Sequence, residues 1–323
     1  MYQLLDLYFP NGSLLPNLQR LTCFINWEYF VWIKLFFSPS LFFIDLNTLG
    51  NNPDPIAGPV LGLLPMDTLQ MLRLEGVILD ADSMKMLSDR LFNLSTPLQE
   101  LITYHKISNE AAIHISKLSN LRTLGISFRK SNFTLPEATD VFPSLDCLYA
   151  EVDDNLDWLD LLKGMRAGLK YLSITWAMDL VPPQHFMQRL VSAPYASGAQ
   201  DTLRALHINA ERRWIISRKT MAPLLSLRNL TTLSIRTRCH PHPCPFHLSD
   251  ADIAQLASSL RKLEVLILGG SRCTNPPPRF TMDSLFSLSA YCTSLLRLKV
   301  HFNAPKVEYS TAQPLQQTKG ESG

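Results

Sequence analysis

The residues best suited to metal chemistry lie between positions 239 and 247, in the sequence CHPHPCPFH. Thiolates and imidazoles are preferred zinc ligands, and Cys239, His242, Cys244 and His247 supply both groups. The two cysteines are widely spaced for a zinc motif, and the prolines between these residues hold the segment extended and splay its neighbours apart. We therefore expect a loop at the rim of the fold here, with no metal or other cofactor. A zinc site built from these four residues is the alternative.

Covalent catalysis has little support in the sequence. The chain contains no GxSxG, phosphate-binding P-loop, GxGxxG or HExxH motif. Cys147 lies beside acidic residues, which disfavour a thiolate. Asp153 and Asp154 are adjacent, so their carboxyl groups point in different directions and a solvated turn is the simplest interpretation. We expect a protein that is not an enzyme, and a zinc- or thiol-dependent enzyme is the least favoured alternative.

The composition indicates a folded chain with an apolar core. Of 323 residues, 46% are apolar and 18% are charged, and the net charge is +2. A protein that binds phosphate backbones normally carries a large positive charge, so we expect no nucleic-acid partner. Residues 131–162 hold eight acidic and no basic residues, whereas residues 201–240 hold eight basic and two acidic ones. We interpret these segments as solvated surfaces of opposite charge, with an oriented docking field as the alternative.

The cysteines and the N-terminus predict the compartment. Six cysteines are few and irregularly placed for a chain of this length, which indicates free thiols in a reducing environment. Residues 1–13 show neither the basic region nor the small-residue cleavage site of a secretory signal. We therefore expect a cytoplasmic or nuclear protein.

A short leucine phrase recurs along the chain. It reads Leu, two variable residues, Leu, one variable residue and an apolar residue, and we count the residue that follows as position seven. Clear copies begin at Leu69, Leu121, Leu169, Leu203, Leu230, Leu263 and Leu295, and weaker ones at Leu18, Leu41, Leu98 and Leu145. These eleven leucines are 23 to 34 residues apart. A period of this length is typical of solenoids built from stacked repeats.

An aromatic stretch at residues 25–46 raises the question of a membrane span. Glu28 and Lys34 would be costly in hydrocarbon, and Pro39 would break a spanning helix. The last six residues of the stretch, LFFIDL, also fit the leucine phrase. We therefore expect no membrane contact and assign the aromatic residues to the core of the second repeat's outer layer, with Ser38–Ser40 turning the chain into a strand.

The alternation within the phrase predicts one short strand in each repeat. Successive side chains of a strand point to opposite faces, so positions four and six enter the core while positions three, five and seven face outward. Between the strands, residues 108–118, 249–260 and 281–292 carry apolar side chains at helical spacing. The sequence therefore predicts an α/β leucine-rich-repeat solenoid with a parallel inner sheet and outer helices.

About eleven irregular repeats are expected to form one domain over residues 1–303. Proline-rich segments at 51–60, 192–201 and 274–279 are predicted to be loops at its rim. Residues 304–323 are predicted to be a disordered tail.

Several segments resemble the leucine-rich-repeat regions of F-box proteins, most closely the divergent F-box/LRR-like proteins of fungi. LRLEGVILDADSMKML (72–87) and AYCTSLLRLKV (290–300) resemble the strand, turn and helix of the cysteine-containing repeat class. LLPNLQRLTCF (14–24) and KLFFSPSLFFIDL (34–46) resemble the opening repeats of the fungal proteins. The resemblance covers about residues 10–303. It implies a horseshoe that recognises substrates for an SCF-type ubiquitin ligase complex.

F-box proteins dock on a Skp-type adaptor through a helical module that precedes the repeats. The chain shows no Leu-Pro-x-Glu-like opening of such a module and is expected to begin almost within its first repeat. Adaptor binding is therefore expected only if an F-box is supplied upstream. The alternative is a leucine-rich-repeat scaffold or inhibitor that works without an adaptor.

The outward positions of the phrases predict a concave face that binds a protein target. That face would display Arg73, Glu75, Tyr104, Tyr149, Glu151, Tyr171, His207, Asn209 and Arg236, with Thr175, Lys299 and His301 beside them. Tyrosine and arginine dominate the hot spots of protein interfaces. The three tyrosines are therefore the predicted anchor of the target.

Overall fold

The computed structural model describes residues 13–300, except 50–56, 77–78, 95–97, 129–140, 154–157, 166–167, 177–182, 184, 196–198, 211–213, 238–244 and 270–280. Within these limits the chain is an α/β protein with one parallel sheet of 11 strands and a separate two-stranded sheet. The proline-rich segment at 274–279 and the predicted tail at 304–323 lie outside the described residues.

The large sheet follows the chain from one end to the other. Its strands are β1 (Arg20–Asn26), β2 (Phe43–Leu49), β3 (Met71–Glu75), β4 (Glu100–Thr103), β5 (Thr123–Ser127), β6 (Cys147–Val152), β7 (Tyr171–Trp176), β8 (Ala205–Ala210), β10 (Thr232–Thr237), β12 (Val265–Leu268) and β13 (Arg297–Val300). Neighbours in this order pair in parallel. The short strands β9 (Ile216–Ser217) and β11 (Phe246–His247) pair with each other outside this sheet.

Each strand of the large sheet begins at position three of a leucine phrase. The leucines at position four are buried through the middle of the sheet: Leu124 and Leu172 are 1% exposed, and Leu206 and Leu233 are fully covered. On the last strand, β13, the equivalent Leu298 is 38% exposed. The predicted strands and their core positions are therefore confirmed, and the apolar stack is open at its described C-terminal end.

A shared carbonyl joins each strand to the next. At each of the ten described junctions, the carbonyl oxygen of position two accepts hydrogen bonds from the N–H groups of positions two and three in the following phrase. Asp146, for example, accepts from Lys170 at 2.8 Å and from Tyr171 at 3.0 Å. Because this bond pair recurs at the same positions, equivalent residues of successive phrases stand side by side along the sheet.

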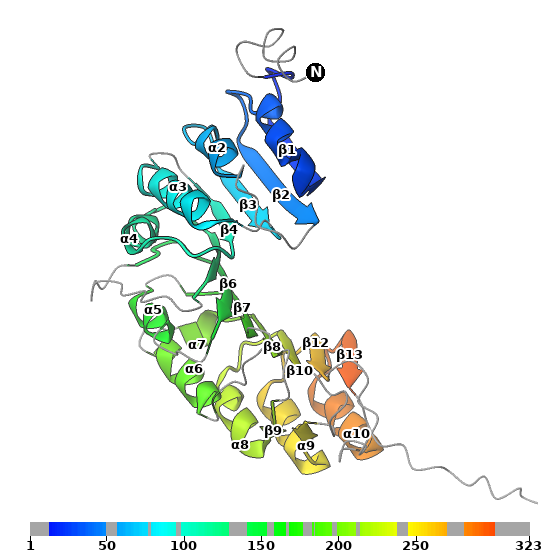
Figure 1. The fold of residues 1–323 in the computed structure, drawn as a ribbon. Helices are drawn as coiled ribbons and strands as arrows, with labels where there is room; N and C mark the ends of the chain where they lie inside the picture. The colour runs from blue at the N-terminus through cyan, green and yellow to red at the C-terminus, as the bar shows by residue number, and fades with distance from the viewer. Residues whose placement is uncertain are drawn as a thin grey trace, which may run out of the picture.

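Helices cover the outer side of the sheet along its curved course (Figure 1). They are η1 (Trp27–Phe36), α2 (Ala57–Gly62), α3 (Ala81–Phe92), α4 (Asn109–Ser116), α5 (Leu159–Gly164), α6 (Phe186–Tyr195), α7 (Ala199–Thr202), α8 (Arg218–Met221), η2 (Ala222–Ser226), α9 (Asp250–Ser259) and α10 (Met282–Tyr291). The helices expected within 108–118, 249–260 and 281–292 are α4, α9 and α10. Strands thus lie on the inside of the curve and helices on the outside.

Polar side chains define the starts of these helices. Ser249 caps α9 in a capping box with Asp252, and Ser108 accepts from the Ala111 N–H at the start of α4. Asp250 of α9 also accepts hydrogen bonds from the next repeat, from the Thr281 N–H at 2.6 Å and from the Ser284 hydroxyl at 2.5 Å. The same carboxylate therefore ties α9 to the N-terminus of α10.

Two of the segments predicted to be loops contain helix instead. Helix α2 begins at Ala57, inside the predicted loop 51–60, and residues 192–195 continue α6. Pro59 is the third residue of α2, and a proline is tolerated in the first turn because that N–H has no partner within the helix. In α6, buried Leu190 and Val191 hold the preceding turn against the core. Proline therefore marks helix ends here rather than loops.

The aromatic stretch is divided between a 3₁₀ helix and a strand. Helix η1 spans ten residues and is followed by β2, and Ile33 and Leu35 of η1 are buried. Ser38 donates to the Leu18 carbonyl at 2.7 Å, which holds the turn before β2 against the first phrase. Among the described residues, no helix is both long and apolar enough to cross a bilayer.

Replacing the same phrase position in the middle and at the end of the sheet should have unequal effects. Leu206→Ala removes a fully covered side chain and should lower the free energy of unfolding by about 2 to 5 kcal/mol. Leu298→Ala removes a side chain that is 38% exposed and should cost less than half as much. Urea unfolding followed by circular dichroism measures both. An equal loss of unfolding free energy in the two variants would contradict the difference in burial between Leu206 and Leu298.

Candidate binding face

The inner face of the sheet is formed by positions three, five and seven of the phrases. Register aligns position five across the central strands, where Gly125 pairs with Tyr149, Tyr149 with Ser173, and Ser173 with His207. Position seven is aligned in the same way, so that Glu151, Thr175, Asn209 and Arg236 are consecutive neighbours on β6, β7, β8 and β10. Residues far apart in the sequence thus share one continuous surface.

Three aromatic side chains on this face contact one another, and we call them the aromatic row: Tyr149, Tyr171 and His207. The ring centroids of Tyr149 and Tyr171 are 5.0 Å apart with a 42° angle between the planes. Tyr171 and His207 are also 5.0 Å apart and are stacked at 29°. The row crosses β6, β7 and β8. Its partly exposed rings offer an apolar contact surface with polar groups at its edges.

Burial makes the phenols of this region hold their protons to higher pH than an ordinary tyrosine, which is itself neutral at pH 7. It raises the pKa of Tyr149 to about 12, with a further contribution from the neighbouring Tyr171. It also raises the pKa of Tyr104 to about 12, helped by the negative charge of Glu75. At neutral pH both groups are therefore hydroxyls that can donate as well as accept hydrogen bonds.

His207 is likewise neutral near pH 7. Its pKa is lowered by burial and, to a smaller extent, by the positive charge of Arg236. A neutral imidazole retains one donor and one acceptor nitrogen. The aromatic row is therefore an uncharged patch.

Beside this patch, β5 carries no side chain at position five. A Cβ atom on Gly125 would lie 2.8 Å from Ile102 Cγ2 and 3.2 Å from Ile102 Cα. Glycine therefore allows β4 and β5 to approach closely on the inner side of the curve. Ile102 is only 5% exposed, and at the same position Ser234 and Ile267 are 2% and 4% exposed. The expectation that position five always faces solvent is therefore wrong where the concave side is crowded.

An ion pair lies on the N-terminal side of the aromatic row. The Arg73 guanidinium donates from Nε to Oε1 of Glu100, whose side chain is only 10% exposed. This hydrogen bond raises the pKa of Arg73. Glu100 was absent from the predicted binding face, although it occupies position three of the phrase that begins at Leu98. Reading position three in every phrase would have identified it.

All nine residues predicted for the binding face are partly or fully exposed, as are Thr175 and Lys299: Arg73, Glu75, Tyr104, Tyr149, Glu151, Tyr171, His207, Asn209 and Arg236. Tyr149 and Tyr171 meet directly, and Glu151 and Arg236 lie at opposite ends of the aligned row of position seven. His301 lies outside the described residues.

Of the four proposed metal ligands, one lies within the described residues. Cys239, His242 and Cys244 lie outside the described residues, and His247 is an exposed residue of β11. In the part of the chain that the structure describes, no three His, Cys, Asp or Glu side chains come together in a way that could hold a metal ion.

The described thiols sit where burial disfavours their reactive form. Cys23, Cys147 and Cys292 are free, and burial raises the pKa of each. Cys292 ends α10 and is 2% exposed, with Sγ 3.6 Å from the Leu260 carbonyl oxygen, as expected for packing at a helix end.

The solvated turn predicted for Asp153 and Asp154 is wrong for Asp153, which is 8% exposed. Asp154 lies outside the described residues.

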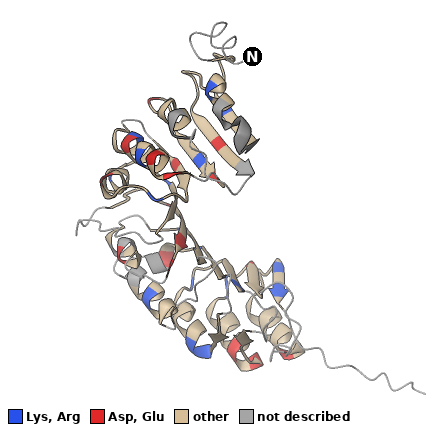
Figure 2. Ribbon diagram, in the orientation of Figure 1, with Lys and Arg blue, Asp and Glu red and all other residues tan. Residues whose placement is uncertain are grey.

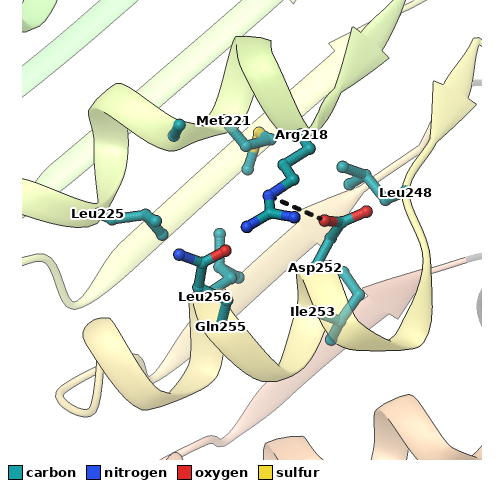
Figure 3. A pocket seen from close by; sticks show the side chains of 9 residues that line it. Arg218, Met221, Leu225, Leu248, Asp252, Ile253, Gln255 and Leu256 are labelled. Atoms are coloured by element: carbon teal, nitrogen blue, oxygen red, sulfur yellow. Dashed lines mark ion pairs between the residues drawn. The ribbon is translucent and has the colours of Figure 1, made fainter.

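A shallow pocket on the outer side lies between α8 and α9 (Figure 3). Met221, Leu225 and Leu256 line it, and Arg218 reaches over it toward Asp252, with Nε 3.8 Å from Oδ1. The other carboxylate oxygen of Asp252 accepts hydrogen bonds from the Ser249 N–H and hydroxyl. One oxygen of Asp252 therefore holds the start of α9 and the other faces Arg218 of α8, so the pocket is better explained as a seam between helices than as a reactive centre.

No model of a known protein family matches the chain, and a search of curated proteins finds no significant match. What the inner face can bind is therefore deduced from its own geometry and charge.

The raised pKa values of Tyr104 and Tyr149 should make stability depend on alkaline pH. Because the folded chain holds these protons up to a pKa of about 12, against 10.0 for an ordinary tyrosine, their contribution is complete below about pH 10 and declines as the pH rises toward 12. In the double variant Tyr104→Phe and Tyr149→Phe, stability should decline less over this range. Urea unfolding at a series of alkaline pH values measures the slope. An unchanged slope would contradict the burial of these hydroxyls.

Proposed function

We propose that the chain is a leucine-rich-repeat solenoid of horseshoe form that binds another protein on its concave face and catalyses no reaction. The observation that carries this proposal is the aromatic row, which is displayed on strands held in register by a recurring hydrogen-bond pair. The coincidence of all eleven leucine phrases with described strands supports the repeat architecture.

The mechanism is the presentation of a preformed surface. The strands under the aromatic row are fixed by backbone hydrogen bonds and by covered core residues such as Leu148, Leu172 and Leu206. Little backbone conformational freedom is therefore lost on binding, which lowers the entropic cost of association. The aromatic side chains have few rotamers and offer large contact areas. Their neutral hydroxyl groups supply directional hydrogen bonds.

We further propose that this surface selects substrates for an F-box-type ubiquitin ligase in the cytoplasm or nucleus. The resemblance of residues 72–87 and 290–300 to repeats of F-box proteins supports this assignment. A Skp-type adaptor would then bind through an F-box supplied upstream of the repeats. A scaffold or inhibitor that works without an adaptor is the competing form of the same binding function.

Truncating the two tyrosines of the aromatic row should weaken target binding without unfolding the chain. A photocrosslinker placed at Ser173, between Tyr149 and His207 in register, would capture the target in cells, and titration calorimetry would then measure its affinity. Tyr149→Ala combined with Tyr171→Ala should weaken binding at least 30-fold, since hot-spot truncations cost about 2 kcal/mol or more.

Two matched variants separate binding from other effects. Tyr291→Ala removes a 41% exposed tyrosine from the outer helix α10 and should leave the affinity unchanged. Cys239→Ser should also leave the affinity for the target unchanged. A loss of target binding in this variant would favour a zinc- or thiol-based site. Full affinity in the Tyr149 and Tyr171 double variant would refute the concave face as the binding surface.

Ligase membership has its own test. The complete product of the gene, purified from its source cells, should retain a Skp-type adaptor together with the target. Retention of the target with no adaptor in a quantitative pull-down would instead identify an adaptor-independent scaffold.

A further inference from the structure

We propose that the partner crosses the inner face in one fixed orientation, as an extended segment with basic residues against β2–β6 and acidic residues against β10–β13. This inference rests on the proposed function, because it concerns the partner of the same face. It goes beyond that function by naming the chemistry and direction of what binds.

The sector of the inner face formed by β2–β6 is acidic, and the edge strand β1 before it carries one exposed base, Arg20, at position three. At positions three, five and seven of β2–β6, the charged residues are Asp45, Glu75, Glu100 and Glu151 against Arg73 alone, a net charge of −3. Figure 2 shows acidic segments on these strands. Arg73 already pairs with Glu100. The sector therefore keeps an excess of negative charge that favours lysine or arginine on the partner.

The C-terminal sector has the opposite sign. Across the described outward positions of β10–β13, the charged residues are Arg236, Arg297 and Lys299, a net charge of +3. All three are exposed. The edge strand β13 is correspondingly basic in Figure 2. This sector favours aspartate or glutamate on the partner.

The aromatic row forms a neutral zone between the two sectors. Along position seven, the aligned residues change from acidic Glu151 through neutral Thr175 and Asn209 to basic Arg236. Neighbouring strands are about 4.8 Å apart, so this change occurs over roughly 14 Å. That distance exceeds the Debye length of about 8 Å at physiological ionic strength, and the sectors therefore act as separate charges.

The dimensions of the face fit a short extended segment. From β2 to β13 there are nine strand intervals, which correspond to roughly 43 Å along the sheet. An extended chain covers this span with about 13 residues. A segment laid in reverse would place like charges together at both ends, which selects one orientation over the other. The acidic sector would repel a nucleic acid, which would find favourable electrostatic interactions only in the basic sector.

A random peptide library displayed on phage provides the probe. The library is selected on the wild-type chain and, separately, on a charge-inverted variant carrying Glu75→Lys, Glu151→Lys, Arg236→Glu and Lys299→Glu. Peptides from the wild-type selection should combine a basic cluster and an acidic cluster. These peptides are then synthesised, and calorimetry measures their affinities. They should bind the inverted variant at least roughly tenfold more weakly than the wild-type chain. Peptides whose basic and acidic residues are exchanged should prefer the inverted variant.

The matched control makes an equal exchange of charge away from the inner face. It carries Asp67→Lys, Asp89→Lys, Lys85→Glu and Lys117→Glu, all at exposed sites on α3, at the end of α4 or in the turn before β3. It should bind the selected peptides as the wild type does. Circular dichroism and urea unfolding establish that both quadruple variants are folded.

The outcomes distinguish the two proposals. Peptides that lose affinity in the Tyr149→Ala and Tyr171→Ala variant but bind the wild-type and charge-inverted chains equally would overturn the fixed orientation and leave the proposed function standing. Peptides whose affinity is unchanged in the Tyr149→Ala and Tyr171→Ala variant would contradict the concave face as the binding surface. A wild-type chain that binds single-stranded oligonucleotides more tightly than any selected peptide would overturn the protein partner.

Discussion

The shared carbonyl at position two of each phrase is the constraint on which the rest of the structure depends. It accepts two N–H groups from the next phrase at every described junction, and so it fixes the register of neighbouring strands. With register fixed, position four always meets position four in the core, as in the covered pair Leu172 and Leu206. A shift by one residue would send these leucines to the inner face, so burial and hydrogen bonding enforce the same arrangement.

The same register produces the candidate binding face. It brings Tyr149 of β6 diagonally beside Tyr171 of β7, which in turn lies beside His207 of β8. None of these three side chains is needed in the apolar core, which is built from positions four and six. Inner positions whose side chains are partly exposed can therefore vary without disturbing the core, whereas covered ones such as Ile102 cannot.

Much of the architecture was predictable because it depends on local spacing. The leucine phrase predicted all eleven strands of the large sheet, and the apolar spacing within residues 249–260 predicted α9. Prolines misled the prediction at 51–60 and 192–201, since Pro59 and Pro194 lie near helix ends rather than in loops. Proline excludes the middle of a helix, but the sequence does not reveal how near the end lies.

The sequence alone determined the parallel strands, their buried leucines and most of the residues that reach the inner face, because period-two alternation acts within each phrase. Only the tertiary structure decided which inner residues touch. The ring contacts of Tyr171, the pairing of Arg73 with Glu100 and the burial of Ile102 beside Gly125 all depend on strand register and on the curvature of the sheet. Both arise from the stacking of many repeats, and no single repeat encodes them.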